Sequence, residues 1–241
     1  ETLPDQIQKI DLPGKLSDLV VSSTRSKLYI SNVEQQKLLV VNLDNYQIEK
    51  ELNIGIKVEE MLVDKNNDCL FILGAKNTLL SIDLADLSQK KFTFKTELKD
   101  ISLTKDYLYL ATVGEYNLIK FDIRKNQVID KFAVTHNDNL IKPSQIDNLT
   151  DQYLFIDKVF GESLIYQLEN LTNPIANFDI GIVKKSIFSK LGKENYLYVA
   201  NTHHPLQVYG GSDAGDFSLK NKFEEIATPV DFTIDQQQKR I

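Results

Sequence analysis

The sequence has no tryptophan and only one cysteine among its 241 residues. With Cys69 alone, no intrachain disulfide can form. This is compatible with a reducing compartment and equally with bacterial envelope proteins that lack disulfides. No apolar run approaches the roughly 18 residues that a membrane-spanning helix needs. The sequence therefore predicts a globular chain without internal cross-links or a transmembrane segment.

An excess of positive charge is also lacking. The chain has 28 Lys and Arg against 34 Asp and Glu, a formal net charge of −6. Binding to nucleic-acid phosphates requires clustered Lys and Arg, so we expect no nucleic-acid partner. The hydrophobic fraction of 42% and the charged fraction of 26% are ordinary for a globular protein. An all-β fold of this length is commonly one domain.

A short apolar run with an aromatic residue recurs along the chain, and its leading Leu steps by 42, 38, 46 and 43 residues. The five copies are Leu28–Ser31, Leu70–Leu73, Leu108–Ala111, Leu154–Asp157 and Leu197–Ala200. A second run follows each copy after about eight to ten residues. These second runs are Leu39–Leu43, Leu80–Leu84, Ile119–Ile123, Leu164–Leu168 and the degraded Leu206–Tyr209. Their length and their Val, Ile, Leu, Tyr and Phe content predict β-strands.

Each unit also has a more polar outer strand and an inner strand that opens the next unit. Expected outer strands are Glu49–Ile54, Lys90–Phe94 and Asp130–Val134, and expected inner strands include Asp18–Ser22 and Ile101–Leu103. Four strands in a unit of about forty residues are typical of a β-propeller. We predict an all-β fold of four-stranded blades, with five complete repeats and a partial sixth.

The two ends of the chain set the expected ring size. An outer strand at Ile7–Leu12 opens the chain and an inner strand at Val230–Ile234 nearly ends it. Residues 1–241 are then a single propeller domain, incomplete at its C-terminal end, which belongs to a six- or seven-bladed ring when complete. We expect missing C-terminal residues or another segment to complete it, because an open edge exposes unpaired backbone.

The units resemble the propeller repeats of bacterial surface proteins that are named YVTN and LVIVD after their consensus letters. The likeness rests on Leu19–Ser23, Lys27–Asn32 and Leu39–Leu43 in the first unit and on Ser163–Pro174 in the fourth, where a polar Asn-Pro tail precedes the expected outer strand. Without tryptophan, the chain lacks the Trp-Asp pair of WD40 blades. The resemblance, together with a processed-looking start at Glu1, favours a secreted protein at the periplasm or cell surface; a cloned boundary explains that start equally well.

One polar position recurs at the start of each expected inner strand. Its members are Asp18, Glu60, Asp100, Gln145, Ser186 and Asp231, spaced by 42, 40, 45, 41 and 45 residues. In a propeller these residues ring one mouth of the central channel. Carboxylate oxygens are the ligands that Ca²⁺ prefers, so the ring is a candidate cation or ligand site. The alternatives are a solvated rim, neutralised in part by Lys184 and Lys185, or carboxylates that cap backbone N–H groups.

We do not expect the other polar features of the sequence to form a catalytic or metal site. We interpret His203-His204 as an exposed loop pair, because no further zinc ligand accompanies it at a suitable spacing. Gly210–Gly215 is expected to be a flexible loop between strands, and His136–Lys142 a longer loop. Cys69 opens an apolar strand and should behave as a small core residue. No base accompanies a Ser or Cys nucleophile, and no catalytic residue is assigned.

The sequence therefore favours a non-enzymatic binding module without a cofactor, whose loops and channel mouth bind a protein or carbohydrate partner. The alternative is a metal-dependent hydrolase similar to lactonase propellers, in which a cation on the carboxylate ring polarises an ester. Substitution of Asp18 or Glu60 separates the two hypotheses, since only the hydrolase depends on them.

Overall fold

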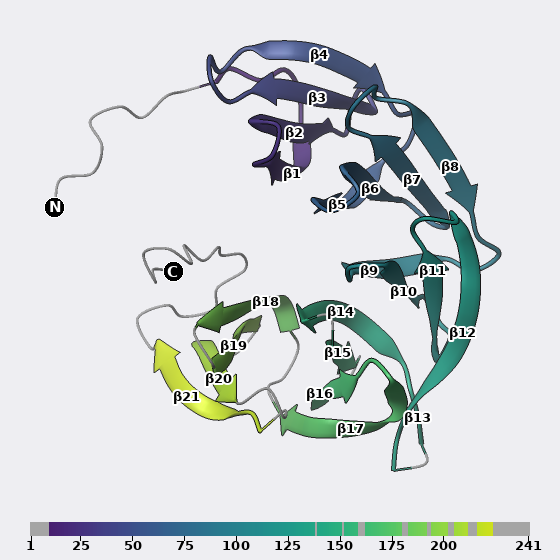
Figure 1. Ribbon diagram of the computed structural model, residues 1–241, viewed down its shortest axis with the longest axis vertical. Helices are drawn as coiled ribbons and strands as arrows, with labels where there is room; N and C mark the ends of the chain where they lie inside the picture. The colour runs from purple at the N-terminus through teal and green to yellow at the C-terminus, as the bar shows by residue number, and fades with distance from the viewer. Residues whose placement is uncertain are drawn as a thin grey trace, which may run out of the picture. The chain divides into compact units, whose positions relative to one another are not determined.

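A computed structural model describes residues 10–137, 139–150, 152–158, 162–179, 183–191, 194–201, 205–211 and 216–223. These residues form 21 strands and no helix. Consecutive strands pair antiparallel into five four-stranded blades of a β-propeller, and the third blade carries an additional short strand (Figure 1). The predicted all-β propeller is confirmed. None of the described residues forms a helix long and apolar enough to span a membrane.

Each blade uses its strands in sequence order, so a strand's position in the repeat fixes its place in the sheet. The first strands are β1 (Leu16–Ser22), β5 (Val58–Asp64), β9 (Leu98–Leu103), β14 (Pro143–Thr150) and β18 (Val183–Leu191). The second strands are β2 (Lys27–Asn32), β6 (Cys69–Gly74), β10 (Tyr107–Thr112), β15 (Tyr153–Lys158) and β19 (Glu194–Asn201). The third strands are β3 (Lys37–Asn42), β7 (Thr78–Asp83), β11 (Asn117–Asp122), β16 (Glu162–Gln167) and β20 (Leu206–Gly211). The fourth strands are β4 (Ile48–Asn53), β8 (Gln89–Thr93), β12 (Gln127–His136), β17 (Asn170–Asp179) and β21 (Ser218–Phe223).

The second and third strands form the core because they are apolar on both faces. In β6, every residue from Leu70 to Gly74 is buried. By contrast, β8 has no buried residue, which is the exposure expected of a fourth strand at a sheet edge. The repeated apolar runs therefore identify the central strands of each sheet.

Two expected loops are strands in the structure. The segment after Thr135 continues β12 to His136 and turns back as β13 (Asn139–Ile141), which pairs with β12. The fourth blade has no tail before its outer strand, because β17 already begins at Asn170 and includes Pro174. Pro174 lies at a register shift opposite Tyr166, where a residue without an N–H is tolerated at a sheet edge.

The glycine pair Gly210-Gly211 ends β20 rather than lying in a loop. A Cβ at position 211 would lie 2.3 Å from the carbonyl oxygen of Asp216, a contact that side chains cannot make. The glycine is needed here for a close backbone approach. The remainder of the predicted Gly-rich loop, residues 212–215, lies outside the described residues.

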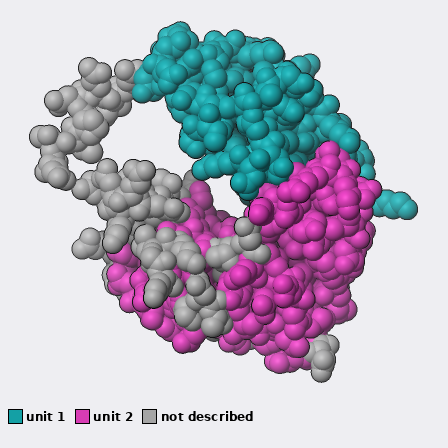
Figure 2. Space-filling view, viewed as in Figure 1, with its two compact units in different colours: residues 1–98 teal, residues 99–241 magenta. Residues whose placement is uncertain are grey.

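The chain divides into two compact units, residues 1–98 and 99–241 (Figure 2). In the first unit, one buried cluster joins blades 1 and 2. It consists of Tyr29, Leu38, Val40, Leu52, Ile54, Ile56, Val58, Met61, Leu70, Ile72, Leu80, Ile82 and Leu84. In the second unit, one cluster built around Tyr109 and Tyr166 joins blades 3 and 4, and another built around Phe155 and Leu197 joins blades 4 and 5. Apolar side chains between adjacent blades hold each unit together.

The predicted partial sixth blade, including Val230–Ile234, lies outside the described residues. Residues 7–9 of the predicted first strand lie outside them too, and residues 10–12 are not in a strand. Ile10 and Leu12 nevertheless pack against a buried cluster of blade 1, formed by Ile30, Leu39 and Val41. This part of the chain thus covers an apolar face of the first blade.

Candidate binding surface

The recurring polar position predicted from the sequence maps to the start of the first strands. The Asp18 carboxylate on β1 accepts the backbone N–H of Met61 on β5 at 2.7 Å and that of Leu19 at 2.8 Å. The two bonds use different oxygens, Oδ2 and Oδ1. Since Met61 belongs to the next blade, the Asp18 side chain joins blades 1 and 2 through the backbone.

Asp100 makes the same pair of bonds in the second unit. Its Oδ2 accepts the N–H of Ile146 on β14 at 2.6 Å, and its Oδ1 accepts the N–H of Ile101 at 3.1 Å. Both bonds are of the charge-assisted type, which is stronger than a bond between neutral groups. This is the capping role that the sequence left open as an alternative to a cation site.

The other predicted ring residues do not all lie at the position equivalent to Asp18. Glu60 and Gln145 occupy the positions equivalent to Asp18, opposite Leu73 and Asp157 of their second strands. In blade 5, Lys185 lies at that position, opposite Ala200, and Ser186 lies one residue further on. Asp231 is outside the described residues, as are His203 and His204.

The pairing of the first strands is irregular near the position of Lys185. Shifts recur just before this position, between Leu16 and Leu19, Val58 and Glu60, Pro143 and Gln145, and Val183 and Lys185. The pairing with the second strand, which resumes after the shift in each of these blades, locates the ring position at Lys185 in blade 5. Only the pairing register shows that this position holds a lysine in blade 5.

Asp147 is an acidic residue that the sequence reasoning missed. It lies on β14 opposite Phe155, and its Oδ2 accepts a hydrogen bond of 3.1 Å from Ser186 Oγ of the next blade. Burial raises the pKa of Asp147 to about 7, and the negative charge of Asp100 adds to the rise. The hydrogen bond from Ser186 and the positive charge of Lys185 oppose it. The equivalent positions of three other blades hold the apolar residues Val20, Leu62 and Ile187, which gave no signal for a carboxylate here.

A cleft of about 320 Å³ opens between blades 1 and 2. Tyr29 lies in its lining together with an apolar wall and a rim of charged side chains. The lining residues are Arg25, Lys27, Tyr29, Val40, Glu49, Lys50, Leu84, Ala85 and Leu87. They come from β2, β3, β4 and the two turns β1–β2 and β7–β8.

The charged rim of this cleft is organised by ion pairs. Arg25 Nε donates to both carboxylate oxygens of Asp68 at 2.7 and 2.8 Å, and a second guanidinium nitrogen also contacts this carboxylate. This bidentate contact raises the pKa of Arg25 and lowers that of Asp68. Lys27 pairs with Glu49, whose pKa the contact lowers. The pairs fix two of the three cationic side chains that line the cleft.

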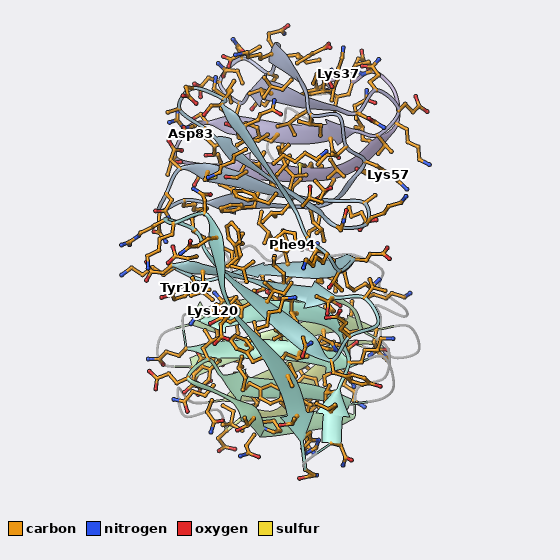
Figure 3. All side chains as sticks on the ribbon, turned by 90° about the vertical axis from the view of Figure 1, so that its right-hand side faces the viewer. Lys37, Lys57, Asp83, Phe94, Tyr107 and Lys120 are labelled. Atoms are coloured by element: carbon orange, nitrogen blue, oxygen red, sulfur yellow. The ribbon has the colours of Figure 1, made fainter. Side chains whose placement is uncertain are left out.

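A second cleft, of about 230 Å³, opens between blades 3 and 4 at the equivalent place. Tyr109 corresponds to Tyr29 of the first cleft and Leu168 corresponds to Leu84. The Lys120 ammonium lies 4.0 Å from the centre of the Tyr107 ring and 5.9 Å from that of Tyr109, a cation–π arrangement. Figure 3 shows the side chains of Tyr107 and Lys120 side by side on neighbouring strands. Asp106 and Glu169 add carboxylates to this lining.

No group of three His, Cys, Asp or Glu side chains suited to a metal ion is found in the described part of the chain. Cys69 is partly exposed, and its thiol lies 3.0 Å from Ser81 Oγ. The two blade-edge clefts each bring several polar groups together on a concave surface, and the sequence reasoning did not identify them. A recurring tyrosine in the second strand was their only sequence signal.

No profile of a known protein family matches the chain, and no curated protein sequence matches it. Solved structures do match. The β-propeller domain of Cps50 (Swd1) from Myceliophteria thermophila is 13% identical, with a TM-score of 0.75 over 92% of this chain and 76% of that one. Hydrazine synthase from Kuenenia stuttgartiensis is 14% identical, with a TM-score of 0.66 over 91% of this chain and 68% of that one. The WD40 domain of Toxoplasma gondii coronin is 14% identical, with a TM-score of 0.65 over 86% of this chain and 58% of that one.

At these identities the likeness establishes the fold alone. The chain therefore has a β-propeller fold, and one of the similar structures is a WD40 domain, although this chain has no tryptophan and therefore no Trp-Asp pair. The resemblance to YVTN and LVIVD repeats stays a prediction, because no family profile supports it.

Proposed function

We propose that this chain is a non-enzymatic binding module whose partner is a protein. The observation that carries the proposal is the recurrence of a blade-edge cleft at equivalent places in two separate blade pairs. Both clefts combine a buried tyrosine and apolar side chains with a charged rim. An apolar centre within a polar rim is the usual anatomy of a protein-binding surface. The secreted, extracytoplasmic location favoured by the sequence is part of the same proposal.

The hydrogen bonding of the inner-strand carboxylates supports a structural role for them. Asp18 and Asp100 each accept two backbone N–H groups. A carboxylate that holds two blades together has a use that requires neither a metal nor a substrate. The Ca²⁺-dependent hydrolase and the carbohydrate-binding module remain alternatives with their own outcomes in the test.

The test compares three forms of the protein as baits for proteins extracted from the source cells. One is the parent chain, one carries substitutions in both clefts (Lys50→Glu, Leu87→Asn and Glu169→Lys), and one carries Asp18→Asn, Glu60→Gln and Asp100→Asn. We expect a stoichiometric protein partner that the carboxylate variant retains and the cleft variant loses. Circular dichroism and urea unfolding establish that each bait is folded.

Three results would contradict the proposal. One is a partner retained equally by the cleft variant. Another is Ca²⁺-dependent hydrolysis of ester or lactone substrates that the carboxylate variant loses, which would establish the hydrolase. The third is selective binding to an immobilised saccharide panel without any protein partner, which would establish a carbohydrate-binding module.

A further inference from the structure

The cleft between blades 1 and 2 differs in the charge of its lining from its counterpart in the second unit. Its lining holds three cationic side chains, Arg25, Lys27 and Lys50, and a single carboxylate, Glu49. The lining of the other cleft has two cations, Lys105 and Lys120, and two carboxylates, Asp106 and Glu169. In a chain with a net charge of −6, the first cleft is therefore a local excess of positive charge.

Lys50 is the exposed cation of the first cleft. It lies on β4 opposite Val40, so its side chain stands beside the apolar interior of the cleft. Arg25 is engaged with Asp68, and Lys27 with Glu49. An anionic group at the rim would therefore meet Lys50 first and Lys27 second. An exposed charge of this kind accelerates association and makes binding dependent on salt.

The opposite wall is apolar and comes from the β7–β8 turn of the next blade. Leu84 is buried, and Leu87 packs partly buried against the same core cluster. The turn begins at Asp83, labelled in Figure 3, whose carbonyl oxygen accepts the backbone N–H of Leu87 at 2.9 Å. The cleft therefore sets an apolar wall against a cationic rim.

Leu87 adopts a backbone conformation that disfavours leucine. Its φ is +64°, and the equivalent turn residues Tyr46 and Asn126 have φ values of +58° and +55°. Asn tolerates this left-handed region far better than a bulky residue, for which it costs about 1–2 kcal/mol. Blade 3 uses Asn at this position, so the turn itself does not require Leu87. The apolar side chain is what the leucine adds to the wall of the cleft.

We propose that the cleft between blades 1 and 2 binds a segment of the partner protein in which a bulky apolar side chain is flanked by carboxylates. This inference rests on the proposed function and adds the chemistry of the partner. The apolar side chain enters beside Leu87 and Val40, and the flanking carboxylates reach Lys50 and Lys27. The volume of about 320 Å³ lies at the lower end of the range for ligand pockets, which suits one or two side chains.

The test selects peptides from an unbiased displayed library on the immobilised full-length chain. We expect enriched sequences to carry Leu, Ile, Phe or Met next to Asp or Glu. The best of these peptides, labelled with fluorescein, is then titrated by fluorescence anisotropy. We expect Leu87→Asn and Lys50→Glu each to weaken its binding about tenfold, which corresponds to about 1.4 kcal/mol. Raising the salt concentration should weaken binding to the parent and have less effect on Lys50→Glu.

Matched control variants separate the cleft from the general charge of the chain. Lys91→Glu makes the same charge change on β8, exposed and outside the lining of the cleft. Glu169→Lys changes the cleft between blades 3 and 4. We expect both variants to bind the peptide within about twofold of the parent, since neither residue lines the first cleft. Urea unfolding establishes that all four variants are folded, and Leu87→Asn replaces leucine by the residue that blade 3 carries in the same turn.

The inference is overturned if the enriched peptides show no acidic bias, or if Lys91→Glu weakens binding as much as Lys50→Glu. It is also overturned if Leu87→Asn binds as the parent does. If single-variant baits then show that Glu169→Lys loses a captured partner that Lys50→Glu and Leu87→Asn retain, the proposed function stands and only this inference fails. If neither peptides nor captured proteins depend on either cleft, both fail together.

Discussion

The carboxylate of Asp18 in blade 1 accepts the backbone N–H of Met61 in blade 2 at 2.7 Å. Met61 is 2% exposed, so its N–H is remote from water that could replace this acceptor. The same relation between Asp100 and Ile146 recurs between blades 3 and 4. One acidic side chain at the start of a blade thus satisfies a backbone donor that the sheet of the next blade leaves unpaired.

Replacing Asp18 with alanine should destabilise the protein by about 1–3 kcal/mol, because a buried donor loses its charged acceptor. Urea unfolding of Asp18→Ala measures this loss. Asp44→Ala, in the exposed β3–β4 turn, is the matched control and should change the stability by less than about 0.5 kcal/mol. Equal stability of Asp18→Ala and the parent would show that the Met61 N–H finds another partner.

Asp147 should make stability depend on pH. Its pKa is about 7 in the folded protein, above the value of about 3.9 of an unfolded chain. The folded state therefore binds the proton more tightly than the unfolded state. The stabilisation from the protonated carboxyl is fully present below about pH 4 and is lost as the pH rises to about 7.

The measurement is the difference in unfolding free energy between Asp147→Asn and the parent across this pH window. Asparagine stays neutral and keeps an oxygen for Ser186 Oγ, so its advantage should grow by about 1.4 kcal/mol for each unit of pKa shift and level off above about pH 7. A difference that is constant with pH would mean that Asp147 titrates as an ordinary carboxyl.

Two leucines of the first unit should respond very differently to truncation. Leu70 on β6 is 0% exposed and Leu19 on β1 is 58% exposed. Leu70→Ala creates a cavity between blades and should cost about 2–5 kcal/mol, whereas Leu19→Ala should cost less than about 1 kcal/mol. The midpoints of urea unfolding of the two variants test this prediction, provided that the two unfolding curves have the same slope. A similar loss of stability in both variants would mean that Leu19 packs against other residues in solution.

The Cys69 thiol should react slowly in the native protein. Burial raises its pKa, and the hydrogen bond with Ser81 only partly offsets the rise. Since the thiolate is the reactive form, the reaction with an aromatic disulfide reagent near pH 8 should be slower in buffer than in urea. Equal rates under both conditions would show that Cys69 is freely accessible.

The sequence predicted the positions of the strands because blade architecture depends on local chemistry. The apolar runs at Leu28, Leu70, Leu108, Leu154 and Leu197 all lie in second strands, which are buried on both faces. Burial on both faces requires an uninterrupted apolar run, and such a run is visible in a single sequence. The prediction that Gly210 and Gly211 belong to a loop was wrong, because both end β20 and the glycine at 211 is required only by the approach of the Asp216 backbone.

The recurrence of an acidic side chain at the inner strands was also visible in the sequence, from the spacing of Asp18, Glu60 and Asp100. The hydrogen-bond partners of these carboxylates could not be predicted from the sequence. These partners lie about one repeat away along the chain and meet the carboxylates only when blades pack. The pairing register likewise placed Lys185, not Ser186, at the equivalent position of blade 5.

The repeat of hydrophobic runs by itself determined that the chain is a propeller of four-stranded blades, since the burial of each strand follows from the apolar or polar character of its own residues. The clefts, the cross-blade hydrogen bonds of Asp18 and Asp100, and the raised pKa of Asp147 were decided only by the tertiary structure. Each of these features joins residues of different blades. Their distances and burial follow from how the sheets pack, which no local pattern of residues specifies.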